Sequence, residues 1–306
     1  MYDKTDLRST LAPASAGKPV DGTLFDAEYG LFYKDPPVED DGNGKSWYTR
    51  GQNFIVAYSE AKPGAVFERM AQTDEYMLLI PYADTPAILS ASGQQERCDG
   101  YSLVIMPPGD SRIEMPQGGT IVRIFTTRSD DLVAKCANAS GYDEQHGNIP
   151  PLVDWPAPEG GFKIRVYSLD VPPVPGRFGR IWRSTNMMLN IPPVAMGPRN
   201  VAKVSPHHHD DFEQCSLALE GQWAHHMRWP WSVDMGSWRD DVHVEVGSPS
   251  VTVIPAQVIH TSTWKSPERN QLVDIFSPPR VDFSQKPGWV LNADDYPMPP
   301  SAGGDR

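Results

Sequence analysis

The stretch that decides the fold lies in the second half of the chain and reads Pro206-His207-His208-His209-Asp210-Asp211-Phe212-Glu213-Gln214-Cys215-Ser216-Leu217-Ala218-Leu219-Glu220-Gly221. Further along comes Pro255-Ala256-Gln257-Val258-Ile259-His260. Side chains of an extended strand alternate between its two faces, so His207 and His209 point the same way. Glu213 or Gln214 comes from the next strand, and His260 comes from a distant one. We therefore expect three imidazoles and one oxygen donor to converge from three strands.

The histidines of this chain are concentrated in one segment. Seven of the eight fall between His207 and His260, and the first 145 residues contain none. Neutral imidazole is the commonest metal ligand, so the segment predicts a metal site. The alternative is a chance surface run or a tag-like artefact, but tags lie at termini and this run is internal. We expect His207, His209 and His260 to bind the metal, and His208 and His243 to lie at the surface.

The first stretch resembles the first motif of the cupin superfamily, which is a Gly, His-x-His, three or four residues, a Glu or Gln, six residues and a Gly. The order His207-x-His209, four residues, Gln214, six residues and Gly221 fits this motif. The upstream glycine, Gly197, lies farther from His207 than the family spacing asks. The resemblance implies a cupin barrel that holds a metal.

The second stretch matches the second cupin motif more loosely; that motif is a Gly, five residues, Pro-x-Gly, two residues, His, three residues and Asn. The spacing from Pro255 to His260 is kept, whereas Gly247 lies two residues too far from Pro255. Gln257 stands where the family has Gly, and Trp264 stands where it has Asn. Together the two motifs indicate the fold and a metal, and they say little about the substrate.

The fourth ligand is either Gln214 or Glu213. Counting back six residues from Gly221 gives Gln214, while leaving three residues after His209 gives Glu213. A shift of one residue moves a side chain to the other face of a strand, so only one of them can be a ligand. We favour Gln214 and keep Glu213 as the alternative. A neutral Gln leaves the full charge of a divalent metal on the site, which strengthens its Lewis acidity and its hold on an anionic substrate.

The composition excludes some classes of protein. The chain has 306 residues, of which 39% are hydrophobic and 22% charged, as in ordinary globular proteins. Its net charge of −12 argues against a nucleic-acid-binding protein, which needs a basic footprint. No apolar run approaches about 18 residues, so we expect no membrane span, and the N-terminus lacks a signal pattern. Three scattered cysteines suit a reducing cytosol, so we expect a cytoplasmic protein with buried cysteines.

Local patterns favour strands over helices. Short runs such as residues 53–58 and 101–106 are rich in β-forming residues and are bounded by turn residues, in a chain with 31 Pro and 25 Gly. This predicts mostly antiparallel β-structure of sandwich or barrel type. The best helix candidate is 129–139, whose Ser-Asp-Asp start suits an N-cap.

The first half of the chain echoes the second. Three segment pairs correspond in the same order, namely 75–82 with 214–221, 100–109 with 247–257, and 122–125 with 273–276. We interpret the chain as an all-β bicupin of two tandem jelly-roll barrels with few short helices. Residues 1–154 would be a degenerate cupin with an N-terminal extension, and residues 155–306 the metal-binding cupin. The proline-rich stretch 148–161 would link them, and the ends 1–19 and 296–306 would be loosely held tails.

The first copy lacks the ligands. By position, Glu68 and Met70 replace the His pair, Glu75 keeps the acid, and Arg112 replaces the last His. We expect a structural salt bridge to fill the old cavity, while the alternative is that Arg112 anchors an anionic ligand. This half would mainly pack against the sheet of the other barrel.

A long insertion separates the two motifs. Residues 223–243 contain four Trp, two Arg and three His. We expect Trp223, Arg228 and also Gln257 to bind substrate, because Trp and Arg can wall a flat or anionic ligand. The alternative is that the insertion covers the barrel mouth or builds the interface of a homo-oligomer, which we expect the protein to form. His225 and His226 are candidates for acid–base catalysis, since imidazole titrates near neutral pH.

The resemblance implies three functions. The first is a non-heme iron dioxygenase that cleaves an aromatic or enolisable substrate, with Fe(II) favoured as cofactor and Arg228 or Arg239 holding an anionic group. The second is a non-redox isomerase, lyase or hydrolase, in which Mn, Ni, Co or Zn polarises a carbonyl. The third is a non-enzymatic protein that binds or stores a small molecule. Family analogy places the dioxygenase first, although a fold does not determine function by itself.

Overall fold

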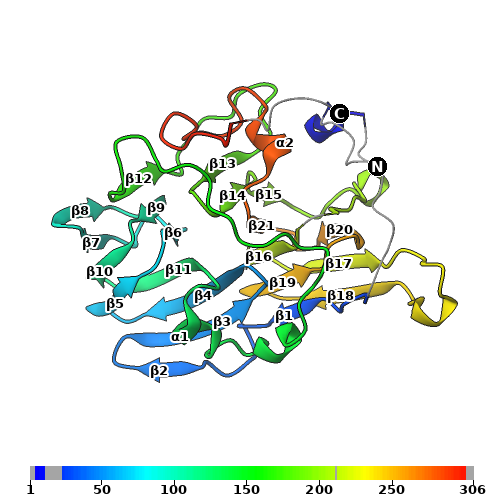
Figure 1. The fold of residues 1–306 in the computed structure, drawn as a ribbon, viewed down its shortest axis with the longest axis horizontal. Helices are drawn as coiled ribbons and strands as arrows, with labels where there is room; N and C mark the ends of the chain where they lie inside the picture. The colour runs from blue at the N-terminus through cyan, green and yellow to red at the C-terminus, as the bar shows by residue number, and fades with distance from the viewer. Residues whose placement is uncertain (1–3, 11–22, 211, 301–306) are drawn as a thin grey trace.

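The computed structural model describes residues 4–10, 23–210 and 212–300 of the chain. These residues form antiparallel sheets with two short α-helices, α1 (Asp130–Val133) and α2 (Val281–Ser284) (Figure 1). The all-β prediction with few short helices is confirmed. None of the helices in the described ranges is long and apolar enough to cross a membrane.

Two sheets form the first barrel. The larger sheet has the strand order β12-β9-β6-β11-β4-β3-β2, and the smaller has the order β5-β10-β7-β8. The strands are β2 (Glu39–Asp41), β3 (Gly44–Arg50), β4 (Phe54–Ala61), β5 (Ala65–Gln72), β6 (Tyr76–Ile80), β7 (Ala87–Ala91), β8 (Gln94–Cys98), β9 (Ser102–Met106), β10 (Gly109–Met115), β11 (Gly119–Thr126) and β12 (Arg165–Ser168).

Two further sheets form the second barrel. The larger has the order β1-β19-β16-β21-β14-β13, with β15 also pairing with β21, and the smaller has the order β18-β17-β20. The strands are β1 (Glu28–Gly30), β13 (Arg180–Arg183), β14 (Met188–Ile191), β15 (Ala195–Met196), β16 (Gln214–Glu220), β17 (Trp223–Arg228), β18 (Val242–Val246), β19 (Ser250–Ile254), β20 (Ile259–Trp264) and β21 (Arg269–Phe276). β6, β9 and β11 therefore have counterparts in β16, β19 and β21, as the sequence echo predicts.

Each barrel is completed by a strand from the other side of the predicted boundary at residue 155. Strand β1 precedes the first barrel in the chain, yet it pairs with β19 of the second. Strand β12 follows the boundary, yet it pairs with β9 of the first. The division of the chain into domains 1–154 and 155–306 stays a prediction. In the structure, β1 and β12 each pair with the barrel on the other side of that boundary.

The two large sheets face each other across a shared apolar layer. Met77 and Leu79 of β6 lie in one cluster with Leu217 of β16 and Val273 of β21. Alternate residues of the same strand, such as Leu78, point into the first barrel and join a second cluster. Fully burying one such side chain contributes about 1.5–3 kcal/mol. The shared layer therefore holds the two barrels together.

Glu75 is part of this contact between barrels. Its carboxylate is fully buried and accepts hydrogen bonds from the Thr185 hydroxyl (3.0 Å), the Thr185 backbone N–H (3.3 Å) and the Tyr296 hydroxyl (2.7 Å). Burial raises the pKa of Glu75, and these donors oppose the shift. Tyr296 is 1% exposed, so it does not begin a loosely held tail as predicted. Of the predicted tails, residues 1–3, 11–19 and 301–306 lie outside the described residues.

The predicted helix over 129–139 is mostly wrong. Only the four residues of α1 are α-helical, and a separate 3₁₀ turn covers Ala139–Tyr142. The Ser129 side chain does not cap the helix, because its hydroxyl is bonded to Gln72 instead. The prediction that the three cysteines are buried is confirmed, and all three are free thiols.

Candidate metal centre

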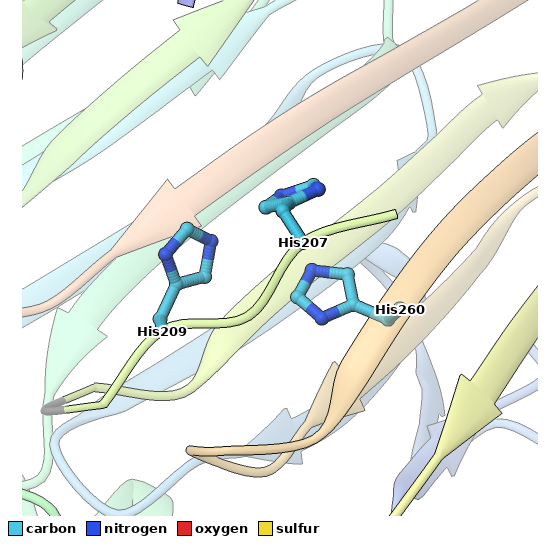
Figure 2. A group of neighbouring side chains, drawn as sticks. All are labelled: His207, His209 and His260. Carbon is cyan, nitrogen blue, oxygen red and sulfur yellow. The ribbon is translucent and has the colours of Figure 1, made fainter. Parts of the chain in front are cut away.

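The three predicted histidine ligands converge from two segments that run side by side. His207 and His260 form an antiparallel bridge, with backbone N–H to carbonyl distances of 3.0 and 2.8 Å in the two directions. His209 lies two residues on and therefore points to the same side. One ring nitrogen from each of the three lies within 4.8 Å of the others, and the rings turn toward a common point (Figure 2).

Backbone carbonyls fix the orientation of two of the rings. The Nδ1 atom of His207 lies 2.8 Å from the Ser205 carbonyl oxygen, and Nδ1 of His260 lies 2.9 Å from the Val258 carbonyl oxygen. A carbonyl can only accept, so each Nδ1 carries the proton. The lone pair of each Nε2 is then available to a metal, which is the usual arrangement of histidine ligands in metal sites.

Gln214 places its amide oxygen beside two of these imidazoles. Its Oε1 lies 3.0 Å from His209 Nε2 and 3.1 Å from His260 Nε2, while its amide nitrogen faces the Ser216 hydroxyl at 3.3 Å. Because Nε2 of His260 carries no proton, its contact with Oε1 brings together two hydrogen-bond acceptors with no proton between them. Donor atoms that share one divalent cation, each at about 2.0–2.2 Å from it, lie about 3–3.5 Å apart. The donor set therefore fits a divalent cation between these atoms.

The imidazoles are held in the neutral form that a metal needs. Burial lowers the pKa of His260 to about 4, and the charges of Arg8 and Arg280 act in the same direction. Burial likewise holds the pKa values of His207 and His209 well below the usual range. Metal binding therefore does not compete with protons on these rings near neutral pH.

Glu213, the alternative ligand, lies on the opposite face of the strand. Its Oε2 accepts the backbone N–H of Gln52 at 2.6 Å, and its Oε1 accepts the Tyr142 hydroxyl at 2.9 Å. His146, the one histidine outside the cluster, approaches the same carboxylate at 3.2 Å. Glu213 thus joins the second barrel to the first, just as Glu75 joins the first barrel to the second. Because Glu213 points away from the three clustered histidines, this geometry favours Gln214 as the ligand.

A cavity of about 290 Å³ opens beside the candidate ligands. His207, His260 and Gln214 form one part of its lining, and the remaining wall is divided equally between apolar and polar residues. The apolar and aromatic lining residues are Phe178, Pro192, Pro193, Ala195, Trp223, Trp264, Leu272, Phe276 and Phe283. The polar lining residues are Asp6, Arg8, Arg199, Ser205, Thr261, Ser262, Asn270, Asp274 and Arg280.

Of the three predicted substrate-binding residues, the structure places one in this cavity. Trp223 is buried in its wall. Arg228 is the last residue of β17, and it is exposed at the surface, away from the cavity. Its guanidinium donates to Asp241. Gln257 is buried in the turn before β20, where its N–H bonds the His209 carbonyl and its side chain accepts from Asn148. Gln257 supports the segment that carries His209 and does not line the cavity.

The two predicted acid–base histidines lie on opposite faces of β17. His226 faces outward, with its Nδ1 2.9 Å from Nδ1 of His243. His225 faces inward and is buried, with its Nδ1 2.8 Å from the hydroxyl of Ser262, a lining residue. Burial lowers the pKa of His225 to about 3, so this ring is neutral, and it contacts the cavity wall at the Ser262 hydroxyl.

Most of the insertion lies outside the cavity. Its loop between β17 and β18 carries Trp231, 73% exposed, stacked on Trp238 at 4.4 Å between ring centroids. The loop projects away from the sheets (Figure 1), and Arg239 pairs with Asp26 instead of facing the cavity. The alternative that the insertion covers the barrel mouth therefore does not hold for this loop.

The first barrel has a packed interior where the second has the histidine cluster and Gln214. Tyr76 opens β6 as Gln214 opens β16, since Tyr76 pairs with Met106 and Gln214 with Ile254, and each partner precedes a proline. The Tyr76 hydroxyl bonds the Ser111 hydroxyl at 2.9 Å, and apolar side chains surround it. Glu75, the predicted counterpart of Gln214, therefore lies one residue before the structural counterpart, Tyr76.

The other predicted counterparts in the first barrel face outward. Arg112 pairs with Glu68 and Glu114 at the surface, and Met70 is 73% exposed. The predicted salt bridge exists, but it does not fill a cavity. A β-bulge between Gly109 and Ser111 shifts the register of β10 by one residue and turns Arg112 to the outside.

Sequence reasoning missed the polar residues of the cavity wall. Asp274 had a local signal, because it interrupts an apolar strand; its partly buried carboxyl accepts from Asn190 at 3.1 Å, and burial raises its pKa. Arg8, Arg199 and Arg280 come from three separate segments, so no local spacing could have grouped them.

Comparison with known proteins identifies the architecture. No family model and no curated protein matches the sequence. The structure is similar to an oxalate decarboxylase of Lactobacillus farciminis solved as a formate complex, with TM-score 0.56, 15% identity, and 85% of this chain and 88% of that chain covered. The chain has the bicupin fold.

Two other solved structures support the same conclusion. AerE from Microcystis aeruginosa matches at TM-score 0.52 and 8% identity, covering 77% of this chain and 92% of that chain. The oxalate decarboxylase of Bacillus subtilis, a protein with Mn(II) centres, matches at TM-score 0.50 and 12% identity, covering 87% and 83%. At such identities the likeness concerns the fold alone.

Proposed function

We propose that this protein is a metal-dependent enzyme that acts on a small organic acid, and that it is a non-heme iron dioxygenase cleaving an aromatic or enolisable substrate. The observation that carries the proposal is the placement of His207, His209, His260 and Gln214 beside a cavity with both aromatic and charged side chains in its wall. A divalent metal held there supplies Lewis acidity and open coordination positions for substrate and dioxygen.

The walls of the cavity suit a flat substrate. Trp223, Trp264 and Phe276 present aromatic surface to it, and such surface excludes water and packs against a planar ring or enol. The volume of about 290 Å³ lies near the lower end of the range for ligand pockets, about 300–1,000 Å³. The substrate is therefore small, and it has an apolar part that contacts these rings.

The charges of the wall favour an anion. Gln214 and the three imidazoles are neutral, so they leave the charge of a bound cation uncompensated. Arg280, which lines the cavity and is 5% exposed, adds a buried positive charge whose internal partner is Asp282. A carboxylate or phenolate is thus the complementary ligand.

A second candidate is a lyase that decarboxylates an organic acid without consuming oxygen. This alternative is favoured because oxalate decarboxylases are among the solved structures with the same fold. Mn would then replace Fe as the preferred metal, whereas Ni, Co and Zn suit the same ligands. A homo-oligomer remains our proposal for the assembly.

The test begins with metal analysis of the purified protein by mass spectrometry. Oxygen uptake and carbon dioxide release are then measured with Fe(II)-loaded and Mn(II)-loaded protein on a panel of hydroxylated aromatic acids, diketones and dicarboxylates. Stoichiometric oxygen uptake supports the dioxygenase, and carbon dioxide release that persists under nitrogen supports the lyase. His260→Ala is the inactive control. Absence of bound metal together with absence of turnover would overturn both in favour of a binding protein.

A further inference from the structure

The N-terminal segment contributes to the cavity of the second barrel. Residues Lys4–Thr10 include a 3₁₀ turn, Leu7–Thr10, and two of them, Asp6 and Arg8, line the cavity. The guanidinium carbon of Arg8 lies 4.6 Å from the ring centroid of Phe178, another lining residue. A segment almost two hundred residues away from the histidine motif thus forms part of its substrate space.

Two guanidinium groups converge at one point of the wall. Nη2 of Arg8 lies 3.1 Å and Nη2 of Arg199 lies 3.0 Å from the hydroxyl oxygen of Ser205. Like charges this close repel each other, so the arrangement needs an anion nearby. The pair also lies beside the metal site, because the Ser205 carbonyl accepts the Nδ1 proton of His207.

Asp6 occupies the anion position. Its carboxylate accepts from Arg8 Nε at 3.1 Å and from Arg8 Nη2 at 2.7 Å, in a forked arrangement. Burial opposes ionisation of Asp6, but the hydrogen bonds and charge of Arg8 and the charge of Arg199 lower its pKa overall. Asp6 therefore holds the place that a carboxylate ligand would take.

We propose that Arg8 and Arg199 form the subsite for the carboxylate of the substrate, and that Asp6 blocks this subsite until the substrate displaces it. The inference rests on the proposed function only in taking the ligand to be an organic acid. An arginine fork matches the geometry of a carboxylate. The ligand class is thus an acid with one carboxylate on the arginine pair and a second oxygen group directed toward the metal ligands.

Equilibrium binding tests this subsite without turnover. Metal-loaded protein is titrated under nitrogen with 2-hydroxybenzoate and with its uncharged amide, 2-hydroxybenzamide, by calorimetry. The wild type should bind the acid more tightly. Arg8→Gln and Arg199→Gln should each weaken binding of the acid by at least about tenfold and leave binding of the amide nearly unchanged. Asp6→Asn should tighten binding of the acid by about threefold or more, because the competing carboxylate is lost.

The chain offers a matched control. Arg97 and Asp99 form the same kind of pair two residues apart, with a 2.8 Å contact, and both side chains are well exposed on the first barrel. Arg97→Gln and Asp99→Asn should leave both affinities unchanged. Circular dichroism of each variant checks that the fold is retained.

Three outcomes would overturn the subsite. They are equal affinity of the wild type for acid and amide, equal weakening of both ligands by Arg8→Gln, and weaker binding of the acid by Asp6→Asn. The last result would mean that Asp6 only positions Arg8. Acid binding that depends on Arg8 and Arg199 but is followed by no turnover with any metal, in air or under nitrogen, leaves the subsite standing and removes the proposed enzymatic function.

Discussion

The two barrels of this chain begin their equivalent central strands with different residues, Tyr76 in the first and Gln214 in the second. In the first, the Tyr76 ring fills the interior and its hydroxyl meets Ser111. In the second, the Gln214 amide meets two imidazoles at the edge of a cavity. The same topology therefore supports either a packed core or a ligand site, and a few interior residues decide between them.

The next interior positions differ in the same way. Leu78 of β6 pairs with Arg123, while Ser216 of β16 pairs with Asp274. Arg123 lies over the ring of Phe67, 4.2 Å from its centroid, and so helps to fill the first barrel. Asp274 lines the open cavity of the second. Large side chains close one barrel, and small or short polar ones leave space in the other.

The strongest test of this difference removes a candidate metal ligand from the second barrel. His260→Ala should abolish retention of a divalent metal, because it removes one of the three clustered imidazoles. Glu68→Ala, at the position in the first barrel that sequence spacing matched to a ligand, should retain the metal. Metal content after dialysis, measured by mass spectrometry, checks both. Stoichiometric metal in His260→Ala would mean that the site lies elsewhere.

Acid should destabilise the protein through the second barrel. The pKa of His260 falls from 6.5 to about 4 on folding, so the unfolded state binds more protons between these values. Stability of the metal-free protein should therefore be full above about pH 6.5 and fall as the pH drops toward 4. The loss from this one ring is about 3 kcal/mol, at about 1.4 kcal/mol for each pKa unit.

Urea unfolding at several pH values measures this loss, and His260→Gln is the matched variant. The variant should lose less stability over the same pH range, because its side chain does not titrate. An equal loss in both proteins would assign the acid sensitivity to other groups.

The two buried glutamates should act on stability and leave the metal site intact. Glu213→Ala removes a carboxylate that accepts the N–H of Gln52, so the unfolding free energy should fall by about 1–3 kcal/mol while bound metal is retained. Glu75→Ala should behave alike, since it has the reciprocal role at Thr185. Chemical unfolding and metal analysis of the same samples check this. Loss of metal in Glu213→Ala with retention in Gln214→Ala would reverse the assignment of the fourth ligand.

The smallest effect concerns a pair of turn residues. Gln257 has a φ of 67°, and Gly109 occupies the corresponding place after the prolines of the first barrel with a φ of 96°. Left-handed backbone costs a non-glycine residue about 1 kcal/mol. Gln257→Gly should therefore raise the free energy of unfolding by up to that amount, minus the contribution of the lost hydrogen bond from Asn148. Gly109→Gln should lower the free energy of unfolding by a similar amount. Thermal unfolding compares them, and stabilisation by Gly109→Gln would contradict the argument.

Much of the site could be predicted from the sequence because its chemistry is local. Histidines two residues apart on an extended segment must share a face, so His207 and His209 point together whatever the fold does. The spacing to Gly221 favoured Gln214, whose Oε1 lies beside two of the imidazoles. Spacing alone could not separate Gln214 from Glu213, since the choice depends on which face of β16 meets the other barrel.

Other sequence predictions failed where the register or a distant contact decides. Arg112 was matched to a ligand position, but a bulge in β10 turns it outward. Arg228 was expected in the cavity, but its strand carries it to the surface beside Asp241. A one-residue shift reverses the face of a side chain, and pattern matching does not detect it.

The sequence by itself determined that this chain is a β-rich repeat with a histidine cluster in one copy, because strand periodicity and ligand spacing are short-range properties. The tertiary structure decided which strands complete each barrel, where β1 and β12 cross between the copies. It also decided the charge of the cavity, since Arg8, Arg199 and Arg280 meet only after distant segments pack together. Long-range packing, which no local pattern encodes, makes both decisions.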